Sequence, residues 1–202
     1  YKIMPTYSPF AVLKNYSFRP TVVSDLKKAV QESTTKGIEN TEREIYIEPT
    51  YEEVVQFFKE CREENSEDNP LSFDIETASG EITCIGFAPS PKRSMVVPFR
   101  DITKKSQAFY DYTTEITIWK EIASLLQDEK ITKVAQNQTY DVSWLSYKYG
   151  IDVAGTVHDT MHAQHSLQPE MEKGLGFLGS IYTNEGAWKN LTSFSKSTKA
   201  EE

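Results

Sequence analysis

The chain has few cysteines, an excess of acidic over basic residues and no long apolar run, and each shortage excludes a class of protein. Two cysteines in 202 residues cannot form a disulfide framework, so we expect free thiols in a reducing, cytoplasmic compartment. No apolar run could span a membrane and no signal-peptide pattern is present, so we expect no membrane association. The net charge of −8 argues against a general phosphate-binding surface; nucleic acid would bind locally, with metal ions supplying positive charge.

The composition is that of an ordinary globular protein. Hydrophobic residues make up 38% and charged residues 26% of a chain long enough for one sizeable core with appendages. The chain begins at Tyr1 rather than at methionine, which suggests a segment of a longer protein. We expect an amino-terminal extension and linker in residues 1–43, a mixed α/β domain in residues 44–190 and a frayed tail in residues 191–202.

The stretch 71–77 places two acidic residues in a predicted strand. Successive strand side chains point to opposite faces, so Asp74 and Glu76 share one face while Phe73 and Ile75 share the other. Two carboxylates about 7 Å apart along a strand repel each other. A hard divalent cation such as Mg²⁺ or Mn²⁺ would remove that conflict. The alternative is a solvent-facing strand that carries two acids without function.

The remaining pattern predicts strands and helices on both sides of this strand. Residues 1–20 should be irregular because prolines interrupt them, and Ser24 should cap a short helix. Thr50 and Glu53 form the capping-box pattern at the start of a helix with an apolar face. Further strands are predicted at residues 44–48, 81–87, 94–99 and 131–135, and further helices at residues 114–127, after Asn137, after Asp159 and at residues 174–182.

A further carboxylate follows the strand predicted at 131–135. Asn137 is the expected cap of a helix, and Asp141 lies four residues later, on the same side of its first turn. If this strand pairs with the strand at 71–77 after a helical crossover, Asp141 comes close to Asp74 and Glu76. The alternative is an acid placed favourably near a helix N-terminus.

Together these residues resemble a known family. Asp74-Ile-Glu76 with Asn137-x-x-x-Asp141 resembles the first and second motifs of 3′–5′ exonucleases with an RNase H-like fold. The stretch His158-Asp-Thr-Met161 and residues 173–183 are similar to the proofreading domain of family A DNA polymerases, phage forms in particular. The resemblance covers roughly residues 44–190.

The resemblance implies a five-stranded mixed sheet flanked by helices and a site for two divalent ions, Mg²⁺ or Mn²⁺. Asp74 would bridge both ions, Glu76 would hold one, and Asp141 would act on the second through water. Thr77 and Asn137 would lie close to the terminal nucleotide of single-stranded DNA. Tyr140 is a candidate for stacking on a base, with simple packing as its alternative. The implied partner is a downstream polymerase domain, in a bacterial or phage-infected cell.

Two features depart from the family pattern. The family's third motif is a Tyr or His shortly before a last metal-binding Asp, yet no aspartate follows Tyr182. We therefore expect an incomplete metal set and weak activity for this segment, with Asp159 as the fallback ligand. Residues 3–10 and 24–28 resemble the tail of a family 4 uracil-DNA glycosylase-like domain, with Ser8 where that family has His, which suggests a fusion partner that excises no uracil.

Three alternatives accompany this interpretation. A non-catalytic module that positions nucleic acid would tolerate an incomplete metal set. An RNA exonuclease of the RNase D kind would use the same carboxylates. The spacing of His158, His162 and His165 also allows a Zn²⁺ site, with histidines packed near a core surface as the simpler interpretation.

Overall fold

The structure is a computed structural model that describes residues 2–37, 41–101 and 107–185. The chain divides into two compact units. The sheet unit comprises residues 41–160, and the helical unit combines residues 1–40 with residues 161–202. The predicted start of the α/β domain at residue 44 lies close to this division, whereas the predicted range 44–190 includes parts of both units. The predicted tail, 191–202, lies outside the described residues.

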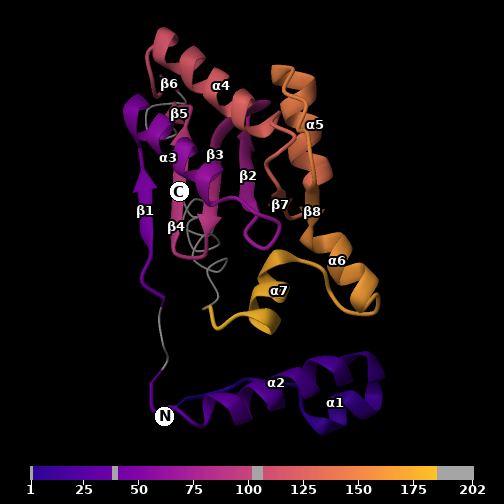
Figure 1. Cartoon of the computed structure of the whole chain (residues 1–202). Helices are drawn as coiled ribbons and strands as arrows, with labels where there is room; N and C mark the ends of the chain where they lie inside the picture. Colours follow the sequence, from indigo (N-terminus) through magenta and orange to yellow (C-terminus); the bar gives the residue numbers. More distant parts are fainter. Residues whose placement is uncertain (1, 38–40, 102–106, 186–202) are drawn as a thin grey trace, which may run out of the picture. The chain divides into compact units, whose positions relative to one another are not determined.

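A six-stranded sheet in the order β1-β4-β3-β2-β7-β8 forms the centre of the sheet unit (Figure 1). The β2–β3 and β3–β4 pairs are antiparallel, and the β1–β4, β2–β7 and β7–β8 pairs are parallel. The predicted mixed sheet is thus confirmed, with one strand more than the expected five. Its strands are β1 (Glu44–Ile47), β2 (Leu71–Ala78), β3 (Glu81–Ser90), β4 (Arg93–Pro98), β7 (Lys133–Ala135) and β8 (Val157–Asp159).

The additional strand, β8, lies in a stretch for which the sequence predicted no strand. It is only three residues long, so the sequence carries no alternation that would mark it as a strand. A separate two-stranded sheet is formed by β5 (Arg100–Asp101) and β6 (Gln107–Ala108), in a stretch predicted to be a loop.

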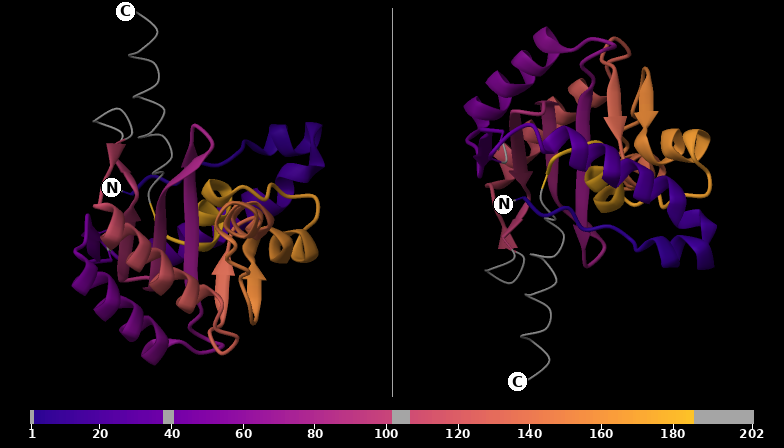
Figure 2. Two further views of the ribbon diagram at one scale, coloured as in Figure 1. Left: turned by 90° about the horizontal axis from the view of Figure 1, so that it is seen from above. Right: turned by 90° about the horizontal axis from the view of Figure 1, so that it is seen from below.

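Helices α3 (Tyr51–Glu64) and α4 (Tyr112–Leu126) cover the apolar face of the sheet (Figures 1 and 2). The Thr50–Glu53 capping box is present at the start of α3, as predicted. Phe58 of α3 packs edge-on against Phe87 of β3, and Trp119 of α4 stacks on Phe99. Each fully buried side chain of this size contributes about 1.5–3 kcal/mol, so this face supplies most of the unit's stability.

Strand β2 shows the predicted alternation and extends beyond its parallel neighbour. Phe73 and Ile75 are buried in the core, whereas Asp74 and Glu76 are exposed. β2 pairs with β7 only at Leu71 and Ser72, because β7 ends and α5 (Gln138–Tyr149) begins. The second half of β2 therefore faces the first turns of α5 rather than a strand on that side.

The amino-terminal part of the helical unit is more regular than predicted. It contains α1 (Pro9–Lys14), a 3₁₀ turn η1 (Tyr16–Phe18) and α2 (Arg19–Glu32), so the expected irregular stretch and the expected cap at Ser24 were wrong. Ser8 caps α1 by accepting the Ala11 N–H at 3.2 Å, with proline at the start of the helix. Pro20 likewise lies in the first turn of α2. Proline is tolerated in a first turn, where the N–H has no helical partner, so here it begins helices rather than ending them.

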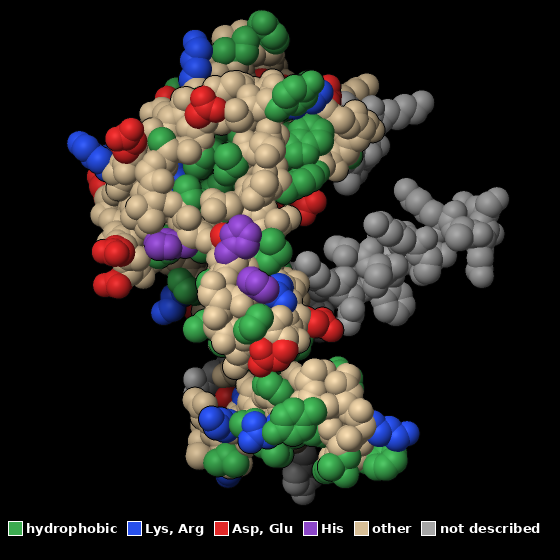
Figure 3. Space-filling view, turned by 90° about the vertical axis from the view of Figure 1, so that its right-hand side faces the viewer, with side chains coloured by type: hydrophobic (Ala, Val, Ile, Leu, Met, Phe, Trp, Pro, Cys, Tyr) green, Lys and Arg blue, Asp and Glu red, His purple; other side chains and the backbone are tan. Residues whose placement is uncertain are grey.

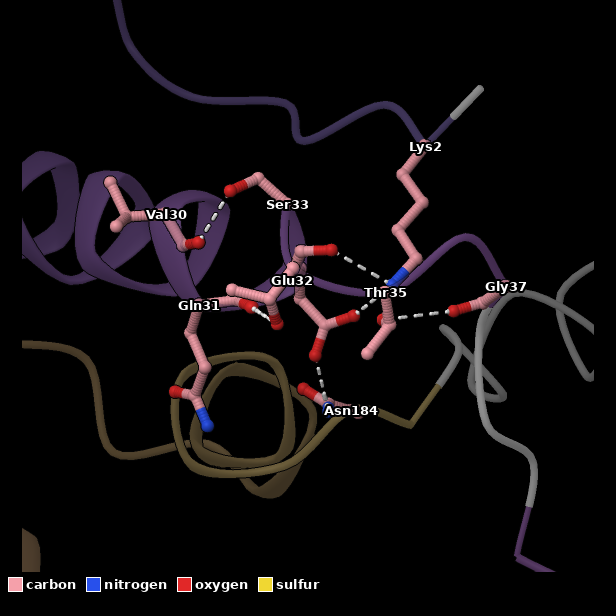
Figure 4. Close-up of polar contacts among 9 residues, drawn as sticks. Lys2, Val30, Gln31, Glu32, Ser33, Thr35, Gly37 and Asn184 are labelled. Atoms are coloured by element: carbon pink, nitrogen blue, oxygen red, sulfur yellow. Dashed lines mark hydrogen bonds and ion pairs between the residues drawn. The ribbon is translucent and has the colours of Figure 1, made fainter.

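The helical unit also contains α6 (Thr160–Leu167, whose first residue belongs to the sheet unit) and α7 (Leu175–Tyr182). Glu32, at the end of α2, joins two distant segments of this unit (Figure 4). Its carboxylate accepts from the Lys2 ammonium at 2.6 Å and from the Asn184 amide at 2.9 Å. None of the helices in the described part of the chain combines the length and the apolar character needed to cross a bilayer.

Candidate active site

The site predicted from the sequence lies where α5 meets the second half of β2. The Asp141 carboxylate accepts the backbone N–H of Ile75 at 2.9 Å, and Asp141 is only 2% exposed. Leu71, four residues earlier, donates its N–H to Thr132 next to β7, so the Ile75 donor points toward the side that β7 no longer covers. Asp141 thus supplies the acceptor that a longer β7 would have supplied, and it does so between the two acids of β2.

The charge of this carboxyl group is poorly compensated. The pKa of Asp141 is raised to about 6, mainly by burial and also by the negative charges of Asp74 and Glu76, against the lowering effect of the Ile75 N–H. Cys84 of β3 pairs with Glu76 across the β2–β3 ladder, and burial followed by the charge of Glu76 raises the pKa of its thiol. The end of β2 therefore carries an excess of negative charge.

The N-terminus of α5 is capped from another strand. Asn137 is the N-cap residue, as predicted, but it holds a left-handed conformation at φ 58° and its side chain forms no capping hydrogen bond. Instead, the buried carboxylate of Asp159 accepts the N–H of Asn137 at 3.1 Å and of Gln138 at 2.9 Å. Asp159 ends β8, and its two oxygens hold the start of α5 where Asp141 can reach β2.

Two residues predicted to contact nucleic acid are joined here. The hydroxyl groups of Thr77 and Tyr140 lie 2.6 Å apart, and the Tyr140 ring is 45% exposed. Thr77 follows an irregularity in the β2–β3 ladder, where Thr83 of β3 is skipped and its hydroxyl donates to the Glu76 carbonyl at 3.0 Å. A bulge bends the strand that carries the extra residue, so this one bends β3 next to the end of β2 where the acids lie.

The donor chemistry at this site suits a hard cation. Carboxylate oxygens are the ligands that Mg²⁺ and Mn²⁺ prefer. Burial and then the charges of Asp74 and Glu76 raise the pKa of Asp141, and a cation would offset both effects. Space is available beside Asp74, because its partner across the ladder is Gly86 and a Cβ added there would meet only the Asp74 carbonyl oxygen, at 3.9 Å.

The carboxylates of Asp74, Glu76 and Asp141 do not surround a common point as the ligands of a bound metal ion would. Among the residues that the structure describes, no three His, Cys, Asp or Glu side chains are gathered tightly enough to hold a metal ion. This applies to the zinc alternative as well: His158, His162 and His165 are all exposed, and histidine side chains are visible at the surface in Figure 3. Any third motif beyond residue 185 lies outside the described residues.

The sequence did not indicate that Thr83 shapes this site or that Asp159 caps α5. An acid at the end of the strand next to β7 was a usable signal for Asp159, but its helical surroundings made it look like a cap for the following helix. Nothing in the sequence marked Thr83, because a bulge depends on how two strands pair.

The family of 3′–5′ exonucleases matches residues 45–199 of the chain. The chain belongs to this family. The predicted family is thereby confirmed, and the match includes both β2 and α5. No curated protein matches the chain significantly.

Solved structures show the same fold. RNase D of Trypanosoma brucei in complex with RNA U12 is 16% identical with a TM-score of 0.54, over 76% of this chain and 52% of that one. The catalytic core of RRP6 from Trypanosoma brucei is 16% identical with a TM-score of 0.51, over 69% and 35%. NrnC of Brucella melitensis with bound Mg²⁺ is 16% identical with a TM-score of 0.45, over 70% and 60%. The first two likenesses confirm the predicted RNase H-like fold. The chain spans only part of each of these proteins.

Proposed function

We propose that the chain removes nucleotides from the 3′ end of single-stranded DNA, slowly because its metal set is incomplete, with Asp74, Glu76 and Asp141 as ligands for Mg²⁺ or Mn²⁺. One observation carries this proposal: in a member of the 3′–5′ exonuclease family, the buried Asp141 carboxylate is bound to the β2 backbone between the other two acids. Asp141 is thereby fixed beside the second half of β2, the strand that carries the other two proposed ligands.

In the proposal, Asp141 differs from the two acids of β2. Asp141 is fixed by the Ile75 N–H, whereas Asp74 and Glu76 are exposed and can turn toward it. A bound cation would lower the pKa of Asp141 and favour its ionised form, because the positive charge offsets both its burial and its acidic neighbours. Divalent cations bound at such a site lower the pKa of water and stabilise the leaving 3′ oxygen.

The nucleotide would lie on the side of Thr77 and Tyr140. Their hydroxyl groups already share a hydrogen bond, and the half-exposed Tyr140 ring offers a stacking surface. Asn137 stands at the start of the same helix with an exposed side chain. We place the terminal nucleotide against these three residues.

The wider setting in this proposal is proofreading, with a downstream polymerase domain as partner. It rests on the resemblance of residues 158–161 and 173–183 to the proofreading domains of family A DNA polymerases. RNA is the second candidate substrate, supported by the fold shared with an RNase D that was solved with RNA U12.

The decisive experiment compares matched DNA and RNA oligonucleotides, each labelled at the 5′ end, in a time course with Mn²⁺ or Mg²⁺. The expected result is a ladder that shortens from the 3′ end, faster on DNA, and only with the metal. Asp74→Asn should slow the release roughly 100-fold or more, the size of loss seen when one group that stabilises charge in the transition state is removed.

Asp68→Asn is the matched control, since it removes an exposed acid three residues before β2 begins. It should leave the rate unchanged. Equal rates for wild type and Asp74→Asn would contradict the proposed site, and faster release from RNA would favour the RNase D alternative. If Mn²⁺ raises the melting temperature but neither polymer is shortened, the non-catalytic alternative is correct.

A further inference from the structure

The helical unit contains a groove along α2 that carries basic and no acidic residues. Two adjoining hollows, of about 330 Å³ and about 400 Å³, share Ser24, Lys27, Ile181 and Tyr182 in their walls. The first also reaches Lys28, and the second reaches Arg19. No aspartate or glutamate lines either hollow, although acids outnumber bases in the chain as a whole.

The positive charge is a property of the whole amino-terminal segment. Residues 2–37 contain six lysine or arginine and two acidic residues, a net charge of +4 in a chain whose net charge is −8. Of the two acids, Glu32 is already bonded to Lys2 at 2.6 Å and to Asn184 (Figure 4). Glu32 is thus engaged with two partners, of which Asn184 lines the first hollow. The pKa of the Glu32 carboxyl is lowered mainly by its hydrogen bond with Lys2 and to a smaller extent by the charge of Lys28.

The basic side chains of the groove other than Lys28 have no carboxylate partner. Arg19 and Lys27 form no ion pair with any described residue, and both are exposed. Lys28 donates to the backbone carbonyls of Ser180, at 3.1 Å, and Thr183, which fix its position without neutralising its charge. The groove is therefore electrostatically suited to a polyanion.

Exposed aromatic rings accompany these cations. The Tyr182 ring is 58% exposed at the groove, and its hydroxyl donates to the buried Gln164 side chain at 2.7 Å, which holds the ring in place. Arg19 lies over the exposed Tyr16 ring at 5.7 Å. Aromatic rings beside cations are typical of surfaces that bind single-stranded nucleic acid, because bases stack on the rings while phosphates meet the charges.

We propose that this groove binds the backbone of single-stranded nucleic acid, with phosphates at Arg19, Lys27 and Lys28 and a base on Tyr182. The inference rests on the proposed function, which supplies a single-stranded polymer as ligand. The groove contacts that polymer away from its 3′ end. Helix α2 precedes residue 45, where the family match begins, whereas the Tyr182 side of the groove lies within the match. Only the α2 side of the groove is therefore outside the shared exonuclease domain.

Circular single-stranded DNA provides the test, because a circle has no 3′ end to be hydrolysed. Its binding to the full chain is measured in EDTA at several salt concentrations. Arg19→Gln/Lys27→Gln should weaken binding at least about fivefold and reduce the slope of log affinity against log salt by about 1.4, since two phosphate contacts are lost. The charge-matched control Lys36→Gln/Lys130→Gln, which alters residues outside the groove, should bind like the wild type.

A second pair of variants tests the stacking. Tyr182→Ala should weaken binding roughly fivefold or more, whereas Tyr182→Phe keeps the ring and should lose little. Circular dichroism confirms that each variant is folded. Wild-type affinity in the Arg19/Lys27 variant would overturn the proposal. The proposal would also fail if the chain bound no circular DNA but bound vesicles with anionic lipids, and if that binding required Arg19 and Lys27.

The outcome is separable from that of the exonuclease proposal. Asp74→Asn should abolish nucleotide release and leave binding of the circle unchanged. If the circle binds through Arg19 and Lys27 but no nucleotide is ever released, the groove stands and the proposed function fails. If release is normal and the groove variants bind like the wild type, the groove proposal fails alone.

Discussion

Two buried charged side chains, one at each end of strand β7, are treated in opposite ways. Lys133 begins β7 and is fully buried, and its ammonium donates to the carbonyls of Asp128, Ile131 and Ala154 at 2.8, 2.9 and 2.7 Å. Asp141, beyond the other end, receives one N–H and lies near two further acids. Each of the three N–H groups of the Lys133 ammonium can thus have its own acceptor. The negative charge of Asp141 is offset mainly by the N–H of Ile75.

The difference distinguishes a structural charge from one suited to binding. Burial lowers the pKa of Lys133, yet three carbonyl dipoles replace the water it has lost, so the ammonium holds two loops together. Asp141 has room for further positive charge, which a cation can supply. The contrast predicts that a change at Lys133 damages folding, whereas one at Asp141 mainly alters the response to pH and metals.

The largest effect is expected from Lys133→Met. The substitution keeps a long side chain but removes the donor for three carbonyl groups, and each group left without a partner costs about 1 kcal/mol or more. We expect the free energy of unfolding to fall by about 3 kcal/mol in urea titrations. Lys130→Met, at an exposed position nearby, is the control and should change stability little. Similar values for the two variants would show that the buried ammonium contributes nothing.

A smaller effect of opposite sign is expected from Asp141→Asn in metal-free buffer. Because folding raises the pKa of Asp141 to about 6, the protonated form is favoured in the folded state, and this contribution is lost as the pH rises from about 4 through 6. Asn keeps an acceptor for Ile75 without the charge. At pH 7.5 the variant should be more stable by about 2–3 kcal/mol, and below about pH 4 the difference should vanish.

Asp141→Ala separates the hydrogen bond from the charge. It leaves the Ile75 N–H without its acceptor and should be less stable than Asp141→Asn by about 1–3 kcal/mol at every pH. Mn²⁺ should raise the melting temperature of the wild type and of neither variant. A pH-independent difference between wild type and Asp141→Asn would refute the account of the charge.

The smallest effect is expected from the Thr77–Tyr140 hydrogen bond at the edge of the site. Tyr140→Phe removes the hydroxyl and keeps the ring, so stability should change by less than about 1 kcal/mol. Under the proposed function, nucleotide release should slow only a few-fold, whereas Tyr140→Ala should slow it more because the stacking surface is lost. Equal rates for the two variants would place the ring outside the path of the nucleotide.

The sequence by itself determined the features that depend on local periodicity. The alternation in β2 separated Asp74 and Glu76 from Phe73 and Ile75, and the pairing of Thr50 with Glu53 marked the start of α3. These patterns need only neighbouring residues, because the side-chain period of a strand and the orphan N–H groups of a helix are local properties. The family motifs followed from the same residues.

Only the tertiary structure decided which partners the polar groups received. Asp141 accepts from Ile75 because β7 stops short beside β2, and the side chain of Asp159 rather than that of Asn137 caps α5 because β8 ends next to it. Arg19 and Tyr182, separated by most of the chain, line one groove because residues of both segments belong to the helical unit. Each depends on where an element ends relative to one distant in sequence, and no local pattern records that distance.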